Sequence, residues 1–347
     1  MFGLLRLLLA VMVLIGHLFW ISDFGRYAVF GFYILSGYLM TLVMHESYGY
    51  SRAGQYRFGV NRFLRLYPGY WFACLVSILL IVSVGQETTN VVSKSLSLPP
   101  DIFSVLANLT MVFPSFFPNH ISPRLSPATW ALTIELFYYF LIALGISKTR
   151  GRTVLWVVVS VVYVAFTYVM DFYWHSRYFA VPAGSLPFSI GAFLFFLAKD
   201  YRLDSQVFRS VLNTKVLFIL VLANAVSGAL LSGDEENTLV VELLFYGNLT
   251  FSSLLILSLI KGGRLVVIPR SLDKFLGDFS YPIYLMHWQI GVLVPVILYG
   301  KSASMKQAIS GSELMLTAVL ILLISLFVIV FVDKPIEKAR DRVRSHS

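Results

Sequence analysis

Long apolar stretches, separated by short polar and basic loops, dominate the pattern along the chain. Counted at about 20 residues for each membrane crossing, they predict ten transmembrane helices. The predicted spans are 4–21, 28–44, 66–85, 126–146, 153–170, 179–198, 215–231, 239–260, 277–300 and 313–332. The stretches are continuous rather than alternating, which favours helices over a transmembrane β-barrel. We therefore expect an all-α integral membrane protein.

Two predicted segments depart from this regular pattern. Pro182 and Pro187 interrupt the sixth span, which makes it the least regular of the ten. Residues 86–125 form a long connection that contains an apolar patch, 102–117, with prolines at both ends. This patch is too short for a full crossing, so we expect a half-inserted or interfacial segment.

Composition and charge agree with a membrane protein. The chain is 58% hydrophobic and only 13% charged, whereas soluble domains carry about 25% charged residues. Its net charge of +9 does not indicate nucleic-acid binding, because most of the 27 lysines and arginines fall in alternate loops. This bias is typical of the cytoplasmic side of membrane proteins and predicts that both termini are cytoplasmic.

We expect a single transmembrane domain over residues 1–347, without an appended soluble domain. It ends in a basic cytoplasmic tail, residues 333–347. The first span has one early positive charge and no small-residue cleavage site, which favours a retained helix over a signal peptide. Cys74 is the only cysteine and lies in an apolar run, so neither a disulfide nor a metal site is expected.

Arg6 and His17 lie eleven residues apart in the first apolar stretch. Eleven residues make about three helical turns, so both side chains share one face, roughly 16 Å apart along the axis. An ionisable group in hydrocarbon costs several kcal/mol unless it has a partner, so this face indicates a polar path. The alternatives are that Arg6 snorkels to the membrane surface and that His17 forms only a helix–helix hydrogen bond.

Glu135 and His287 are two further ionisable side chains inside apolar stretches. Counted from the ends of their spans, both lie near the middle of the membrane, and His17 lies in the outer half. The three groups converge if their helix faces point into one cavity. The alternatives are structural: a neutral, hydrogen-bonded Glu135 and a His287 that joins two helices.

Arg62 and Arg65 lie three residues apart in the predicted inner loop after the second span. Arginines at this spacing share one helix face, and their planar guanidinium groups suit phosphate. We therefore expect a phosphate site near the cytoplasmic membrane surface. The alternative is a basic patch that touches anionic lipid.

Six motifs follow one another along nearly the whole chain. They are Arg6 with ten residues before His17, residues 30–39 (FGFYILSGYL), 62–68 (RFLRLYP), 129–138 (TWALTIELFY), 280–287 (SYPIYLMH) and 333–335 (DKP). With these motifs the chain resembles membrane acyltransferase family 3, which includes O-acetyltransferases of bacterial surface polysaccharides and lipopolysaccharides. It departs from the family pattern at Ile15-Gly16, Ala131 and Asp333, but none of these positions removes an ionisable group.

The resemblance implies an acyl donor in the cytoplasm, usually acetyl-CoA, and an acceptor hydroxyl on a cell-surface glycan. The enzyme would lie in the bacterial inner membrane, with no permanently bound cofactor and no nucleic-acid partner. Arg6, Arg62 and Arg65 would bind the phosphates of coenzyme A. His17 would act as general base or accept the acyl group itself.

The resemblance also implies roles for the remaining candidates. Glu135 would fix the tautomer of His17 in the manner of a triad acid, and His287 would assist proton transfer or bind the acceptor. Trp130, Ser36 and Tyr284 are candidate substrate-binding residues. Two rival interpretations are a transporter that relays protons through these polar groups and a membrane protein of polysaccharide export.

Overall fold

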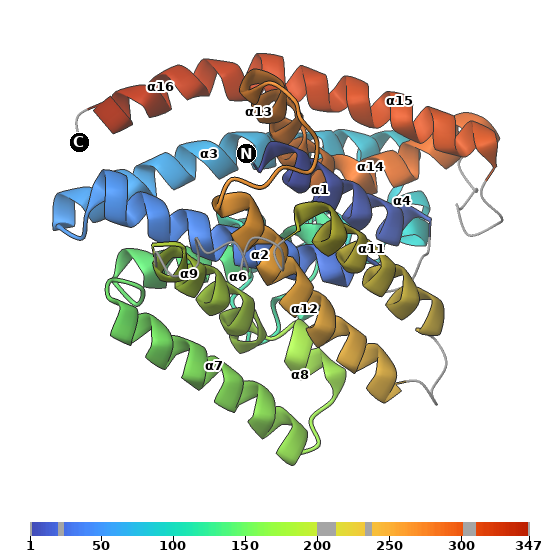
Figure 1. Cartoon of the computed structure of the whole chain (residues 1–347). Helices are drawn as coiled ribbons and strands as arrows, with labels where there is room; N and C mark the ends of the chain where they lie inside the picture. The colour runs from blue at the N-terminus through green and yellow to red at the C-terminus, as the bar shows by residue number, and fades with distance from the viewer. Residues whose placement is uncertain (1, 20–23, 200–212, 233–237, 301–309, 346–347) are drawn as a thin grey trace.

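The computed structural model describes residues 2–19, 24–199, 213–232, 238–300 and 310–345, and all regular structure within these ranges is helical (Figure 1). The α-helices are α1 (Gly3–Leu18), α2 (Phe24–Val43), α3 (Arg52–Val84), α4 (Gln86–Val92), α5 (Ile102–Thr110), α6 (Trp130–Ala143), α7 (Arg150–Val169), α8 (Trp174–Tyr178), α9 (Ser185–Ala198), α11 (Thr214–Leu231), α12 (Thr238–Ile260), α13 (Arg270–Asp278), α14 (Ser280–Tyr299), α15 (Gly311–Val328) and α16 (Lys334–Ser345). Short π-helical turns are η1 (Met44–Tyr48) and η7 (Ile329–Asp333), and short 3₁₀ turns are η2 (Pro118–His120), η3 (Pro127–Thr129) and η4 (Val181–Gly184).

Eight helical stretches in the described ranges are long and apolar enough to cross a membrane. Two shorter apolar helices, Gly3–Leu18 and Pro127–Ala143, occupy the first and fourth predicted spans. Every predicted span therefore coincides with an apolar helix, and the prediction of an all-α integral membrane protein is confirmed. Large apolar side chains on the outside of α7 and α15, such as Leu155 and Leu323, are exposed because lipid surrounds such surfaces.

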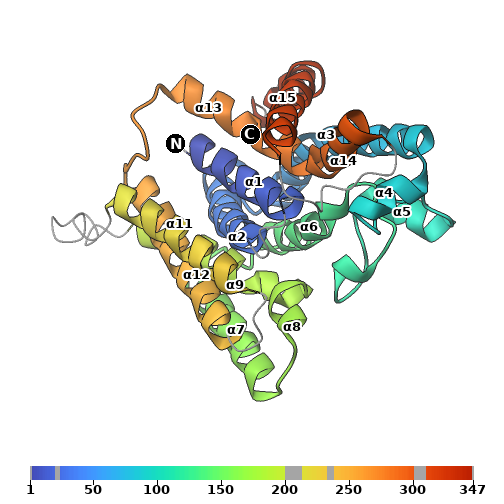
Figure 2. The same ribbon diagram turned by 90° about the vertical axis from the view of Figure 1, so that its right-hand side faces the viewer.

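The helices α1 and α2 lie at the centre of the bundle (Figure 2). α14 and α3 pack on one side of this pair, and α9 and α12 pack on the other. Glycines bring α2 and α9 into backbone contact. A Cβ atom at Gly37 would lie 2.2 Å from the carbonyl oxygen of Phe188, and one at Gly191 would lie 2.0 Å from that of Ile34. Small residues at such contacts allow close helix packing in membranes.

The helix α5 lies against the middle of α3 and belongs to the long segment 86–125. Its last three carbonyls, at residues 108–110, accept hydrogen bonds of 2.5 to 2.9 Å from Tyr70, Trp71 and Tyr67 of α3. Carbonyls at a helix end have no intrahelical partner, and one left unsatisfied in hydrocarbon is costly. Tyr67 lies 17 residues before the end of α3, about 25 Å along its axis. Because α5 contacts α3 this far from its end, a half-inserted position of the segment is favoured over an interfacial one.

The half-inserted segment also contacts the start of α6. Thr133, in the first turn of α6, donates to the carbonyl of Met111 at 3.1 Å and accepts from the backbone N–H of Phe113 at 3.2 Å. The preceding segment therefore holds the first helical turns of the fourth predicted span. Arg124 fixes this connection by donating to the carbonyls of Pro127 and Asn119. Burial lowers the pKa of Arg124 to about 10, so it stays charged at neutral pH.

Arg62 and Arg65 do not lie in a loop, which corrects that part of the expectation. They belong to α3, whose 33 residues extend the third predicted span by some four turns. Gln55, in the first turn of α3, donates to the carbonyl of Ala143 at the end of α6. Arg62 lies about 10 Å beyond Gln55 along the helix axis, and Arg65 about 15 Å. Both arginines are thus drawn into the bundle.

The two prolines of the sixth predicted span do not break its helix. Pro182 lies in the 3₁₀ turn η4, and Pro187 lies in the first turn of α9, where a missing N–H removes no helical hydrogen bond. The predicted tail also has structure, because α16 continues the last span and packs against α3. Lys274 of α13 donates to Glu337 of α16 at 2.7 Å.

Candidate active site

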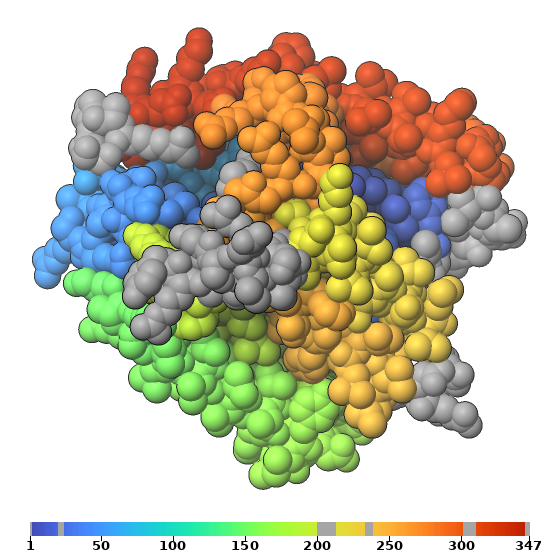
Figure 3. Space-filling model, in the orientation of Figure 1, coloured from blue at the N-terminus to red at the C-terminus, as the bar shows by residue number. Residues whose placement is uncertain are grey.

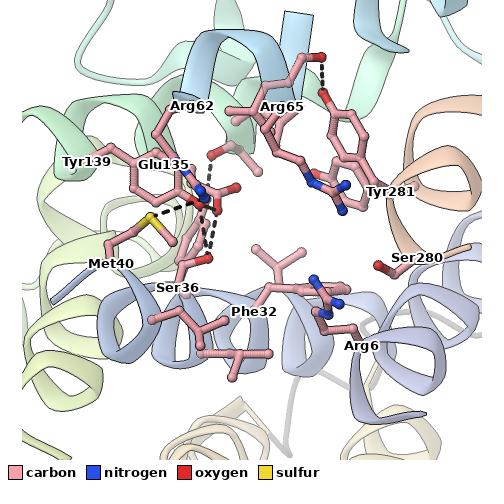
Figure 4. Close-up of a pocket in the computed structure, with 18 residues that line it drawn as sticks. Arg6, Phe32, Ser36, Met40, Arg62, Arg65, Glu135, Tyr139, Ser280 and Tyr281 are labelled. Carbon is pink, nitrogen blue, oxygen red and sulfur yellow. Dashed lines mark hydrogen bonds between the residues drawn. The ribbon is translucent and has the colours of Figure 1, made fainter. Parts of the chain in front are cut away.

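A cavity of about 140 Å³ lies between α1, α2, α3, α6 and α14 (Figure 4). Its polar lining consists of Arg6, Ser36, Arg62, Arg65, Glu135, Tyr139, Ser280, Tyr281 and Tyr284. The remaining lining is apolar and includes Phe32 and Met40. Three consecutive helices and two from later in the sequence, α6 and α14, therefore contribute to one polar pocket inside an apolar bundle. Such a pocket is the default place for substrate binding.

Arg6 and Arg65 face each other across this cavity (Figure 4). Neither guanidinium forms a hydrogen bond or a salt bridge with any residue that the structure describes, and Arg6 Nε is buried. Asp273 and Asp278 act on Arg6 electrostatically but do not bond its side chain. Two like charges that face each other with free donors form a suitable site for an anion.

Arg62 lies on the other side of the cavity with Glu135. Glu135 Oε1 accepts a hydrogen bond of 2.7 Å from Ser36 and another from the hydroxyl of Tyr139. Arg62 acts electrostatically on this carboxyl group and also donates to Asn61 at 3.0 Å. The carboxyl group is therefore held by the cavity wall rather than by a histidine. This network places one acidic and one basic group beside the two facing arginines.

Arg6 is positioned by the contact between α1 and α13. The carboxylate of Asp273 accepts from the backbone N–H groups of Gly3 and Leu4, both at 3.0 Å, and so caps the first turn of α1. A carboxylate at this end also interacts favourably with the helix dipole. A Cβ atom at Gly277 would lie 2.6 Å from the Cα atom of Gly3, so glycine allows α13 to pack closely against the start of α1.

The two predicted histidines meet at the other end of α1. His17 Nδ1 and His287 Nε2 lie 3.0 Å apart, and the two rings are nearly parallel. His287 is completely buried, and its Nδ1 lies 2.8 Å from the carbonyl oxygen of Tyr284. Trp288 packs against the ring of His17 with 4.9 Å between the centroids. The expected convergence of His17 and His287 is therefore present.

Glu135 does not join the histidine pair. Its hydrogen bonds go to Ser36 and Tyr139, so the expected role as the group that orients His17 has no contact to support it. The cavity reaches toward the histidines only as far as Tyr284, whose ring packs near His287 at 6.1 Å. The site thus has two parts: an arginine cavity and a histidine pair, with Tyr284 between them.

Of the three candidate substrate residues, the structure places Ser36 and Tyr284 in the cavity wall. Trp130 lies outside it, buried at the start of α6 against Phe179, with 4.8 Å between ring centroids. Sequence reasoning missed Tyr139, which lies four residues after Glu135 and so shares its helix face. The four-residue spacing from Glu135 was the feature of the sequence that could have identified Tyr139.

The sequence of the chain was compared with known families. The acyltransferase domain of family 3 matches residues 2–333, which is nearly the whole chain. The chain belongs to acyltransferase family 3. As a member, it is a multi-pass membrane enzyme that moves an acyl group from a donor to an acceptor. No curated protein and no solved structure gave a significant match.

Proposed function

We propose that this family 3 acyltransferase is an O-acetyltransferase of the bacterial inner membrane. It takes an acetyl group from cytoplasmic acetyl-CoA and transfers it to a hydroxyl of a cell-surface glycan, such as O-antigen, capsule or exopolysaccharide. The observation that carries the proposal is that Arg6 and Arg65 face each other across the cavity, and neither guanidinium has a bonded partner within the described ranges.

Coenzyme A fits the charge of this cavity because its phosphates carry several negative charges on a compact group. Arginine binds phosphate through two parallel N–H donors, which adds geometric specificity to the charge attraction. Arg62 supplies a third cation on the same helix as Arg65, one turn away. Glu135 lies beside Arg62 and balances part of this positive charge. The carboxyl group thereby reduces the repulsion among the three arginines when no donor is bound.

The arrangement along α1 supports a donor that extends from the cavity to the histidines. Arg6 and His17 share one face of this helix, about 16 Å apart along the axis. A donor held by its phosphates near Arg6 needs a long, thin arm to bring its acyl carbonyl to His17. The pantetheine arm of coenzyme A is such a group. Small acyl donors without an arm, such as acetyl phosphate, do not match this separation.

The chemistry requires a base at the acyl carbonyl. A sugar hydroxyl is a weak nucleophile at neutral pH, and the imidazole of His17 takes its proton as the new C–O bond forms. The C–S bond of the thioester then breaks, and the coenzyme A thiolate receives the proton from His17. Ester and free thiol are the products, and His17 returns to its neutral form. An acetyl group carried first on His17 and then passed to the hydroxyl gives the same balance in two steps.

Sidedness follows from the basic loops. The bias of lysine and arginine toward alternate loops supports a cytoplasmic position for the start of α1, so the arginine cavity opens toward the donor pool. His17 then lies deeper, toward the outer leaflet, where a glycan acceptor is exposed. The half-inserted segment 86–125 would face the same outer side.

Radiolabelled acetyl-CoA tests the proposal with protein reconstituted in vesicles together with the glycolipid fraction of the producing cells. We expect label in the glycan with wild-type protein and none with His17→Ala. A matched control is His45→Gln, since His45 lies in η1 and, among the described residues, contacts the carbonyl of Ser147 and neighbouring rings. Proton flux across the vesicles without label transfer would instead support the transporter interpretation and refute ours.

A further inference from the structure

The hydrogen bonds of the histidine pair determine which ring nitrogens carry protons. His287 Nδ1 lies 2.8 Å from the carbonyl oxygen of Tyr284 and 3.3 Å from that of Ile283. Carbonyl oxygens only accept hydrogen bonds, so His287 Nδ1 must be the donor and must carry a proton. A neutral imidazole has one N–H, and His287 Nε2 therefore holds a lone pair.

The same reasoning then fixes His17. Its Nδ1 lies 3.0 Å from His287 Nε2, and one of these two nitrogens must donate to the other. Since His287 Nε2 holds a lone pair, His17 Nδ1 carries the proton. His17 Nε2 is left as an unprotonated nitrogen, which is the form that a base or nucleophile requires.

A charged His287 would reverse this assignment by donating from Nε2 to His17. That ring is fully buried, and its hydrogen-bond partners are two carbonyls and His17, none of them an anion. A buried charge without an opposite charge beside it costs several kcal/mol. The neutral pair is therefore the stable arrangement.

We propose that His287 is the positioning residue that fixes the tautomer of His17 and directs its Nε2 toward the reacting groups. The inference rests on the proposed acetyl transfer, but the tautomer itself does not depend on it. His287 thus takes the place that a carboxylate occupies in a serine-type triad. When His17 Nε2 gains the hydroxyl proton, its Nδ1–H still donates to His287, so the contact persists through the reaction. Trp288 packs on the ring of His17 and limits its rotation.

Ring ¹⁵N chemical shifts report the tautomer directly. Full-length protein with ¹⁵N-labelled histidine, in lipid at neutral pH, contains six histidines, and the His17 signals are the pair lost in His17→Gln. We expect wild-type His17 to be neutral, protonated at Nδ1 and unprotonated at Nε2. A proton on His17 Nε2 in the wild-type protein would overturn the inference, even where acetyl transfer is normal.

Two substitutions separate positioning from a structural role. The amide nitrogen of His287→Asn can still donate to the Tyr284 carbonyl, but this side chain is too short to reach His17. The amide oxygen of His287→Gln reaches the position of Nε2 and accepts from His17. We expect kcat to fall about 10²-fold or more in the His287→Asn variant. In the His287→Gln variant kcat should lie closer to the wild-type value, and KM for acetyl-CoA should be unchanged in both.

The outcomes distinguish the two proposals. Equal kcat in the Asn and Gln variants, both folded, would show that His287 does not act through its contact with His17. Wild-type protein without any acetyl transfer would refute the proposed function but leave the tautomer measurement valid. If both variants fail to fold, the ¹⁵N spectrum of the wild-type protein alone decides the inference.

Discussion

Arg65→Ala should weaken donor binding and at the same time stabilise the empty protein. The two effects have one cause, the unpaired guanidinium that faces Arg6 across the cavity. If the cavity holds the phosphates of coenzyme A as proposed, Arg65 contributes a charge-assisted hydrogen bond worth about 1.5–3 kcal/mol, so its loss should raise Kd roughly tenfold to a hundredfold. Without donor, the substitution removes a like charge from the vicinity of Arg6 and should raise Tm.

Isothermal titration of detergent-solubilised protein with acetyl-CoA gives Kd, and intrinsic tryptophan fluorescence gives Tm. Arg65→Lys is an intermediate variant, because it keeps the charge but loses the planar guanidinium group. Its Kd for acetyl-CoA should lie between those of the wild type and Arg65→Ala. Arg52→Ala is the matched control. Arg52 is exposed at the first residue of the same helix, about 20 Å from Arg65 along the axis, and is not part of the cavity lining.

Two results would refute this reasoning. An unchanged Kd for acetyl-CoA in Arg65→Ala would show that the cavity does not hold the donor phosphates. A loss of affinity in Arg52→Ala as large as in Arg65→Ala would show that general charge attraction at the membrane surface explains binding. In that case anionic lipid, the alternative considered for these arginines, would be the better partner.

Three further outcomes are expected. His17→Ala should abolish label transfer while leaving Kd for acetyl-CoA near wild type, because the histidine lies outside the arginine cavity; retained transfer would contradict the assignment. In a Cys74→Ser background, cysteines at Ser51 and Ser93 should react with an impermeant thiol reagent from opposite sides, and labelling from one side would refute the topology. Tyr70→Phe should lower the free energy of unfolding by about 1–3 kcal/mol, because it leaves a buried carbonyl of α5 unpaired, and an unchanged urea midpoint would exclude this role.

The spans were predictable from sequence because the thickness of the bilayer fixes the length of an apolar helix. Even Pro182 and Pro187, which made the sixth span uncertain, fall where the helix begins and needs no donor. The lengths of the apolar stretches could not predict how α2 packs on α9. That packing depends on which glycines face each other, and Gly37 and Gly191 are not distinguished from other glycines by any local pattern.

The depth of Glu135 shows why the site was only partly predictable. Counting from the outer end of its span placed it level with the histidines. The helix begins at Pro127, almost where the span was predicted, but the carboxyl group of Glu135 bonds Ser36 and Tyr139 and lies beside Arg62 instead. The position of a residue along one helix is readable from sequence, but the neighbour that its side chain meets depends on how the helices pack and is not.

The separation of the site into two parts has a consequence for how the enzyme selects its donor. Tyr284 contributes to both parts, since its ring lines the arginine cavity and its carbonyl oxygen contacts His287 Nδ1. Its hydroxyl is fixed by donating to the carbonyl of Ala128 at 2.7 Å, and Phe32 packs edge-on against its ring. If coenzyme A is the donor, as proposed, its phosphates stay with the arginines and only its uncharged arm extends past Tyr284 to His17. Tyr284 would then separate recognition of the donor from chemistry on its acyl group.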